Sequence, residues 1–222
     1  KLFFFFLLFS QCLISQTLFE KAEKLYKEKK FEEAKAVFES YLKSDPNHLK
    51  TIEYLGDIAG NSKKWDVAIS YYKKLKLQNP NIATYWFKYG GALGMKAKSV
   101  NKFKALVMIS DIETAFLTAA NLDKKHLESR WALVMLYIEL PGIIGGSETK
   151  ALKYADELLA ISKVDGYLAK GYIDVYYKRY KAAEVNLIKA HQIGKSAITY
   201  AKLYDLYMYK LKDKNKAQNI KK

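Results

Sequence analysis

The sequence contains very little cysteine, proline and glycine. It has a single cysteine, Cys12, among 222 residues, which excludes an intramolecular disulfide framework and a zinc site built from cysteines. Three prolines and 11 glycines are too few for collagen, a proline-rich linker or a β-sandwich with many tight turns. Because 50% of the residues are hydrophobic and 27% are charged, the composition also argues against global disorder.

Arginine is scarce too, although the chain is strongly basic. Of the 38 basic residues only Arg130 and Arg179 are arginines, and the formal net charge is +15. Recognition of guanine and phosphate by paired hydrogen bonds favours the planar guanidinium group, so we expect no nucleic-acid partner. Lysine-rich stretches such as 21–30 and 210–222 fit solubilising helix faces. They also fit a peripheral contact with an anionic membrane surface.

The first fifteen residues have the pattern of an export signal. Lys1 precedes an apolar run that reaches Phe9, which is shorter than the roughly 20 residues of a membrane-spanning helix. A positive residue followed by such a run is typical of a secretory signal peptide. We expect a signal peptide over residues 1–15 and a mature domain over residues 16–222. Lipoprotein attachment through Cys12 is the second interpretation, and both place the protein outside the cytoplasm, in a bacterial periplasm.

A period of 34 residues runs through the rest of the sequence. An aromatic residue, an alanine, a second aromatic residue and a proline recur at this spacing: Phe31, Ala34, Phe38 and Pro46 return as Trp65, Ala68, Tyr72 and Pro80. Gly56, in a Tyr-Leu-Gly-Asp sequence, likewise returns as Gly90. This pattern resembles the tetratricopeptide repeat (TPR) family over residues 17–220. The resemblance implies an all-α fold, a right-handed α-solenoid of about five TPR helical hairpins plus a terminal helix.

Two stretches depart from the period. The third repeat has about ten extra residues between positions 94 and 111. The fourth has an expansion at 140–147, whose Pro-Gly-x-x-Gly-Gly sequence also resembles extracytoplasmic TPR proteins of the TRAP-transporter T-component type. The expansion is either a longer turn capped by Ser147 or a loop over the groove. In the second case the free N–H groups of Gly145, Gly146 and Ser147 contact a ligand at the rim.

The sequence offers no constellation of catalytic or metal-binding residues. The three histidines have no partner at helical spacing that could complete a metal site. Neither a phosphate-binding glycine-rich loop nor a Gly-x-Ser-x-Gly nucleophile motif occurs. We therefore expect a protein that is not an enzyme and needs neither a cofactor nor a metal.

The TPR resemblance implies that one face of each first helix, helix A, lines a concave groove. The expected groove residues are Phe87, Gly91, Trp131, Met135, Ile138, Tyr167, Lys170 and Tyr177, with Gly145, Gly146 and Ser147 as the loop rim. The carboxylate clamp of co-chaperone TPR proteins is not expected, because only Lys88 is basic among the corresponding positions.

Two functions fit these residues. The first is a non-enzymatic scaffold or adaptor of the cell envelope that binds a protein segment or peptide, with Trp131, Phe87 and Tyr167 as anchors. The second is a pocket for an apolar small molecule or lipid in repeats 3–5, with the loop at 140–147 as its rim. A third interpretation is structural, since Phe87 and Trp131 could simply be packed between repeats.

Overall fold

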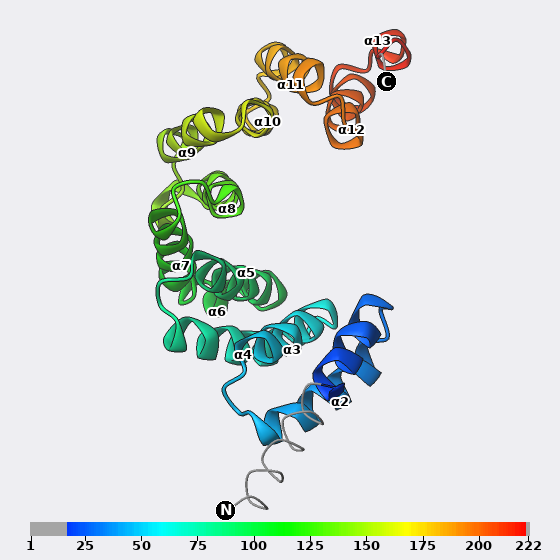
Figure 1. Cartoon of the computed structure of the whole chain (residues 1–222). Helices are drawn as coiled ribbons and strands as arrows, with labels where there is room; N and C mark the ends of the chain where they lie inside the picture. Colours follow the sequence, from blue (N-terminus) through cyan, green and yellow to red (C-terminus); the bar gives the residue numbers. More distant parts are fainter. Residues whose placement is uncertain (1–16, 221–222) are drawn as a thin grey trace, which may run out of the picture. The chain divides into compact units, whose positions relative to one another are not determined.

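The computed structural model describes residues 17–220, which form helices joined by short connections (Figure 1). No β-strand occurs within this described range. The predicted signal peptide, residues 1–15, and Cys12 within it lie outside the described residues.

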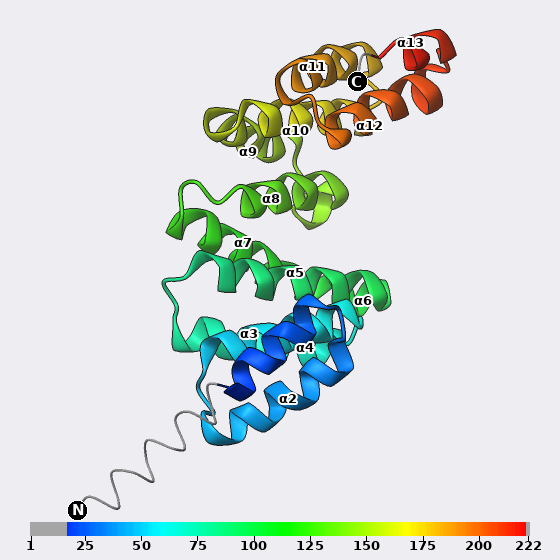
Figure 2. The same ribbon diagram turned by 45° about the vertical axis from the view of Figure 1, so that its right-hand side comes forward.

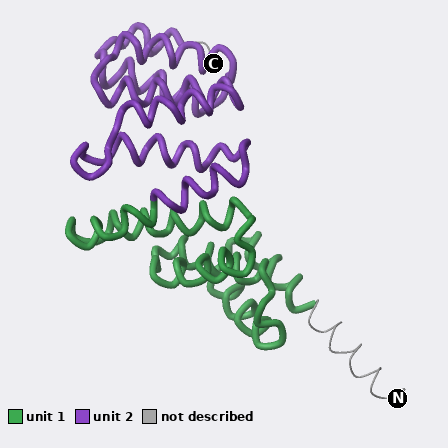
Figure 3. Tube along the Cα trace, turned by 90° about the vertical axis from the view of Figure 1, so that its left-hand side faces the viewer, with its two compact units in different colours: residues 1–112 green, residues 113–222 purple. Residues whose placement is uncertain are grey.

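The chain divides into two compact units, with the boundary between Ile112 and Glu113 inside one helix (Figure 3). Unit 1 contains a helix over residues 17–27 and four helices that follow it: α2 (Phe31–Ser44), α3 (Leu49–Asn61), α4 (Trp65–Gln78) and α5 (Ala83–Ser99). It ends with the short α6 (Lys102–Leu106) and the first residues of α7 (Ile109–Leu122). Each unit is described here by itself.

Unit 2 begins in α7 and continues the alternation of first and second helices. Its elements are α8 (Leu127–Glu139), the short 3-10 helix η1 (Gly142–Ile144), α9 (Glu148–Ile161), α10 (Lys163–Tyr176), α11 (Tyr180–Gly194), α12 (Ala197–Asp205), the π-helical turn η2 (Leu206–Leu211) and α13 (Lys214–Gln218). In unit 2, α8 packs against α9, α9 against α10 and α10 against α11 (Figure 2). This stacking of helical hairpins is the predicted repeat architecture.

The small residues of the period sit where two helices of a hairpin approach closely. A Cβ atom added to Gly56 of α3 would lie 2.5 Å from Cε1 of Tyr72 in α4. Ala34, Phe38 and Ala68 are fully buried. The repeated glycine, alanine and aromatic positions therefore form the core, because a larger side chain at the small positions would push the helices apart.

Three of the turns between paired helices share one unusual backbone conformation. Lys29, Lys63 and Lys178 have φ angles of 61°, 56° and 59°. In each turn the lysine N–H donates a hydrogen bond to the carbonyl three residues earlier. This left-handed region is uncommon for residues other than glycine, asparagine and aspartate. The repeats therefore share the backbone conformation of this turn as well as their pattern of residues.

Both predicted expansions are present as ordered structure. In the third repeat α5 runs on to Ser99, and the extra residues include α6 before α7 begins. In the fourth, the expansion folds into η1 and ends at Ser147, whose side chain accepts a hydrogen bond from the N–H of Lys150 at 3.2 Å. Ser147 is therefore the N-cap of α9, as its position before Glu148 predicts.

Arg130, one of the two arginines, is buried in unit 2, where its hydrogen bonds connect three segments of the chain. Arg130 of α8 is 3% exposed, and its Nε donates to Oε2 of Glu157 in α9 at 2.9 Å. Its Nη1 donates to the carbonyls of Asp123 and His126, and its Nη2 to that of Ala120, at 3.1–3.2 Å. A planar guanidinium can donate hydrogen bonds to acceptors at the end of α7, in the connecting turn and on α9 at the same time.

Candidate functional site

A groove of about 840 Å³ lies in unit 2 between α8, α10 and the continuous segment of α12 and η2. These elements are successive first helices (A helices) of the helical hairpins. Its apolar lining includes Trp131 and Met135 from α8, Val164, Leu168, Tyr172 and Val175 from α10, Leu187 from α11, and Ile198, Leu206 and Tyr209 from the last segment. Met135, Ile198 and Tyr209 are exposed large apolar side chains. Exposed apolar groups gathered in one concavity are typical of a binding surface.

A hydrogen bond inside the protein orients the indole ring of Trp131. Its Nε1 donates to Oδ1 of Asp165 in α10 at 2.9 Å. The other carboxylate oxygen of Asp165 accepts from the hydroxyl of Ser162 at 2.5 Å, and Ser162 is the N-cap of α10. Because its N–H is already bonded, the ring offers apolar surface to the groove.

The charged groups at the groove are balanced in sign. Asp165 and Asp205 contribute two carboxylates, and Lys202 and Lys210 contribute two ammonium groups. A partner of one strong charge would therefore gain little there, so we expect selectivity to come from the pattern of apolar side chains.

The structure separates the predicted groove residues of α8. Trp131 and Met135 line the groove together, whereas Ile138 is 2% exposed and belongs to the core. The prediction that Ile138 lines the groove is wrong. It shares the helical face of the other two, but α8 packs against both α9 and α10 and this residue is covered.

Three of the predicted groove residues lie in α10 or at its C-cap, and their place in a binding groove stays a prediction. Tyr167, Lys170 and Tyr177 are not among the groove-lining residues. The ammonium of Lys170 lies 2.7 Å from Asp156 of α9, and Lys189 lies over the ring of Tyr167. Just before α10, the single residue Ser162 ends α9 and begins α10.

Phe87 and Gly91 belong to α5 in unit 1, so they are described apart from the groove of unit 2. Phe87 is half-buried. A Cβ added to Gly91 would meet no atom within 4 Å, so this glycine borders open space.

The loop at 140–147 uses its backbone donors internally. The N–H of Gly145 donates to the carbonyl of Gly142, that of Gly146 to Pro141, and that of Ser147 to Tyr137. Gly145 has a φ of 105°, and a Cβ on Gly146 would lie against the Leu140 carbonyl. The expectation that these three N–H groups contact a ligand is therefore wrong. The groove is also lined without them, and the glycines serve the tight turn.

The sequence pattern did not predict five of the residues that line the groove. These are Leu168, Tyr172 and Val175 of α10 and Ile198 and Tyr209 of the α12–η2 segment. Their spacing in α10 follows one helical face. The sequence signal that could have found them is Ser162 with Asp165, an N-cap pattern that fixes where α10 begins.

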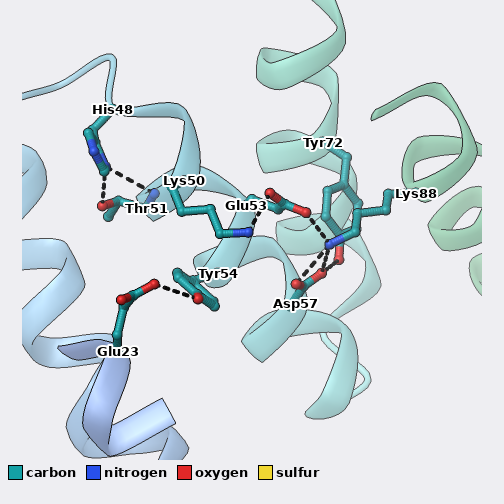
Figure 4. A network of polar contacts seen from close by, with 9 residues as sticks. All are labelled: Glu23, His48, Lys50, Thr51, Glu53, Tyr54, Asp57, Tyr72 and Lys88. Carbon is teal, nitrogen blue, oxygen red and sulfur yellow. Dashed lines mark hydrogen bonds and ion pairs between the residues drawn. The ribbon is translucent and has the colours of Figure 1, made fainter. Parts of the chain in front are cut away.

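A network of charged and phenolic groups lies on the A-helix side of unit 1 (Figure 4). The Lys88 ammonium of α5 lies 2.7 Å from carboxylate oxygens of both Glu53 and Asp57 in α3. The Tyr72 hydroxyl donates to Asp57 at 2.7 Å, and Lys50 lies 3.3 Å from Glu53. Lys88, the one basic residue at a clamp position, is thus held by carboxylates of its own chain.

Three members of the network have shifted pKa values. Burial alone would lower the pKa of Lys88, but hydrogen bonds and charges from Asp57 and Glu53 outweigh it and raise that pKa. Burial would raise the pKa of Glu53, but Lys88 and Lys50 outweigh it and lower that pKa. Burial and the nearby Asp57 raise the pKa of Tyr72. None of these shifts brings a group toward neutral pH, where proton transfer would be efficient. Within residues 17–220, no group of three metal-ligating side chains occurs either.

Comparison with known proteins identifies the fold. No protein-family model and no curated protein sequence matches the chain. The solved structure of TTC0263, a thermophilic TPR protein from Thermus thermophilus, superposes with a TM-score of 0.69 at 14% identity and covers 87% of this chain and 99% of its own. A TPR protein from Parabacteroides merdae gives a TM-score of 0.67 at 16% identity, covering 92% of this chain and 76% of its own.

A third similar structure is YrrB, described as a TPR protein with an unusual peptide-binding site. It has a TM-score of 0.56 at 15% identity and covers 82% of this chain and 87% of its own. At such identities the likeness concerns the fold alone. The chain has the all-α fold of the tetratricopeptide-repeat proteins, as its 34-residue period predicts.

Proposed function

We propose that the protein is an exported, non-enzymatic scaffold whose unit 2 groove binds an apolar segment of a partner protein. The observation that carries this proposal is the set of exposed apolar side chains that line the groove, Met135 of α8 with Ile198 and Tyr209 of the α12–η2 segment, beside the oriented indole of Trp131. A segment in the groove would bury these side chains against its own apolar residues. The peptide-binding site of YrrB, a protein of the same fold, supports this use of the architecture.

The groove favours a protein segment over a small molecule. Its walls are helices that follow one another along the chain, and the loop at 140–147, which would have to close a small-molecule pocket, contributes no lining residue. A partner segment that follows the helices contacts several repeats at once, and its affinity comes from a few large buried anchors.

Trp131 is the anchor whose removal should matter most. Truncation of a central aromatic residue in an interface costs on the order of 2 kcal/mol, which corresponds to about a thirtyfold rise in Kd. Trp131→Ala should therefore weaken binding about thirtyfold. The helices should remain, because the indole is only partly buried.

The test uses the whole chain and peptides selected on it from a displayed random library. Fluorescence anisotropy then measures their affinity for the unchanged chain, for Trp131→Ala and for Tyr209→Ser. Tyr177→Ser is the matched control, because Tyr177 is an exposed tyrosine at the C-cap of α10 that does not line the groove. We expect both groove variants to weaken binding and the control to leave it unchanged. Undiminished binding by a folded Trp131→Ala variant would refute the assignment.

Export rests on the composition of residues 1–15 and has its own test. Mass measurement of the protein recovered from a cell-envelope fraction should give a chain that begins close to residue 16. The native mass of that chain should equal its denatured mass. An additional mass that disappears on denaturation would favour the small-molecule alternative instead.

A further inference from the structure

The short helix α6 of unit 1 has no buried residue and exposes large apolar side chains. Phe103 is 84% exposed and Val107, at the C-cap of the helix, is 79% exposed. Leu106 between them is exposed as well. Single exposed apolar residues need no explanation, but three within five positions form a patch. This α6 patch (Phe103, Leu106 and Val107) lies in the extra residues of the third repeat.

The charges around the α6 patch all have one sign. Residues 95–108 include four lysines and no acidic residue. Lys96 forms an ion pair with Asp66 of α4, whereas Lys102 and Lys104, on either side of Phe103, have exposed side chains. An apolar patch flanked by lysines complements a surface that is negative outside and apolar beneath.

The packing of the helix that follows α6 argues against a membrane-spanning segment here. The helical stretch Lys102–Leu122 is long and apolar enough to span a bilayer by length and composition, with a mean hydropathy of 1.3. Its α7 part, however, buries Ala115, Phe116 and Ala119 in the protein. Since α7 already uses its apolar face in packing, only α6 has apolar surface to offer.

We propose that α6 is an interfacial membrane anchor for anionic phospholipid. Phe103, Leu106 and Val107 enter the boundary between headgroups and acyl chains, and Lys102 and Lys104 contact the phosphate groups. A lipid surface fits better than a protein partner, because lysine is depleted at protein–protein interfaces whereas lysine beside phenylalanine is typical of interfacial helices. The net charge of +15 adds long-range attraction to such a surface.

The test places a fluorescent label at α6 itself. Membrane binding by another part of the chain would therefore not produce the expected signal. Cys12→Ser removes the natural thiol, and Val107→Cys then carries an environment-sensitive fluorophore. Leu77→Cys is the matched control, because Leu77 of α4 is also in unit 1 and is 66% exposed. The probes are vesicles of phosphatidylcholine with phosphatidylglycerol, vesicles of phosphatidylcholine alone, and brominated lipid as a quencher.

We expect a blue-shifted, quenchable emission from the label at position 107 on the anionic vesicles and an unchanged emission from the label at 77. Replacing Lys102 and Lys104 by glutamine should reduce the apparent partition coefficient about thirtyfold, since each lysine near an anionic surface contributes about a factor of five. An unchanged emission at 107, or equal changes at both positions, would overturn the proposal. A shift that depends on protein concentration without vesicles would also overturn it, because a second copy of the chain would then cover the patch.

Discussion

The buried guanidinium of Arg130 makes a quantitative prediction about the stability of unit 2. Replacing Arg130 by methionine keeps an unbranched side chain with apolar methylene groups but removes every donor. The carbonyls of Ala120, Asp123 and His126 lose their bonds to a charged group, and Glu157 loses its partner. Breaking a buried pair by removing one member costs about 3–5 kcal/mol. Because Glu157 is partly exposed and can regain water, we expect the low end, about 3 kcal/mol.

The measurement is urea unfolding of the whole chain, followed by the fluorescence of Trp131, which adjoins Arg130 in unit 2. Replacing Trp65 and Trp86 of unit 1 by phenylalanine in every sample leaves Trp131 as the sole indole. With a urea dependence of about 2 kcal/mol per molar, a loss of about 3 kcal/mol lowers the midpoint by about 1.5 M. Arg130→Lys should recover part of the loss, because it restores the charge without the planar donors.

The other arginine provides the matched control. Arg179 pairs with Glu148 and Asp174 at the surface, and exposed ion pairs contribute up to about 1 kcal/mol. Arg179→Met should therefore lower the midpoint by less than about 0.5 M. If Arg130→Met proved no more harmful than Arg179→Met, the reasoning from buried carbonyls would be refuted.

Two further predictions concern unit 1. Gly56→Ala should lower the free energy of unfolding by about 1–3 kcal/mol, because the new Cβ would collide with the ring of Tyr72. Gly91→Ala should be neutral or raise that free energy by up to about 1 kcal/mol, because its Cβ would enter open space. Thermal unfolding followed by circular dichroism compares them, and equal effects would contradict the packing argument. Lys88→Met should cost about 2 kcal/mol at neutral pH, because it leaves two carboxylates without their main partner. The pKa of Glu53 is lowered from 4.5 in the folded protein, so its stabilisation is present above about pH 4.5 and fades below it. Unfolding midpoints should therefore converge in acid, and a pH-independent difference would contradict this account.

Much of the fold could be predicted from the sequence because the signals were periodic. Alanine, glycine and aromatic residues 34 positions apart mark the places where helices touch, and the contact of Gly56 with Tyr72 is the physical reason for that spacing. The cap at Ser147 could be predicted as well, because a serine before an acidic residue is a local signal.

The groove was harder to predict because it depends on where each helix begins. In α10 the first residue is Lys163, since Ser162 alone separates it from α9. A start shifted by about two residues turns each side chain by about half a circle, so the face that α10 turns to the groove depends on where this helix begins. The exposure of α6 had no sequence signal of its own, since a phenylalanine between lysines occurs on buried and exposed helices alike.

Three of the lysines with left-handed backbone conformations offer an experiment that is replicated within a single molecule. Lys29, Lys63 and Lys178 adopt nearly the same φ, so replacing any one of them by glycine should relieve a similar strain of about 1 kcal/mol, less the added freedom of glycine in the unfolded chain. Because the turns are well separated in sequence, the gains should add. Each replacement also removes one positive charge, so a triple variant would be both more stable and less basic. In a repeat protein, a substitution that stabilises one turn can therefore be introduced at the equivalent position of the other repeats.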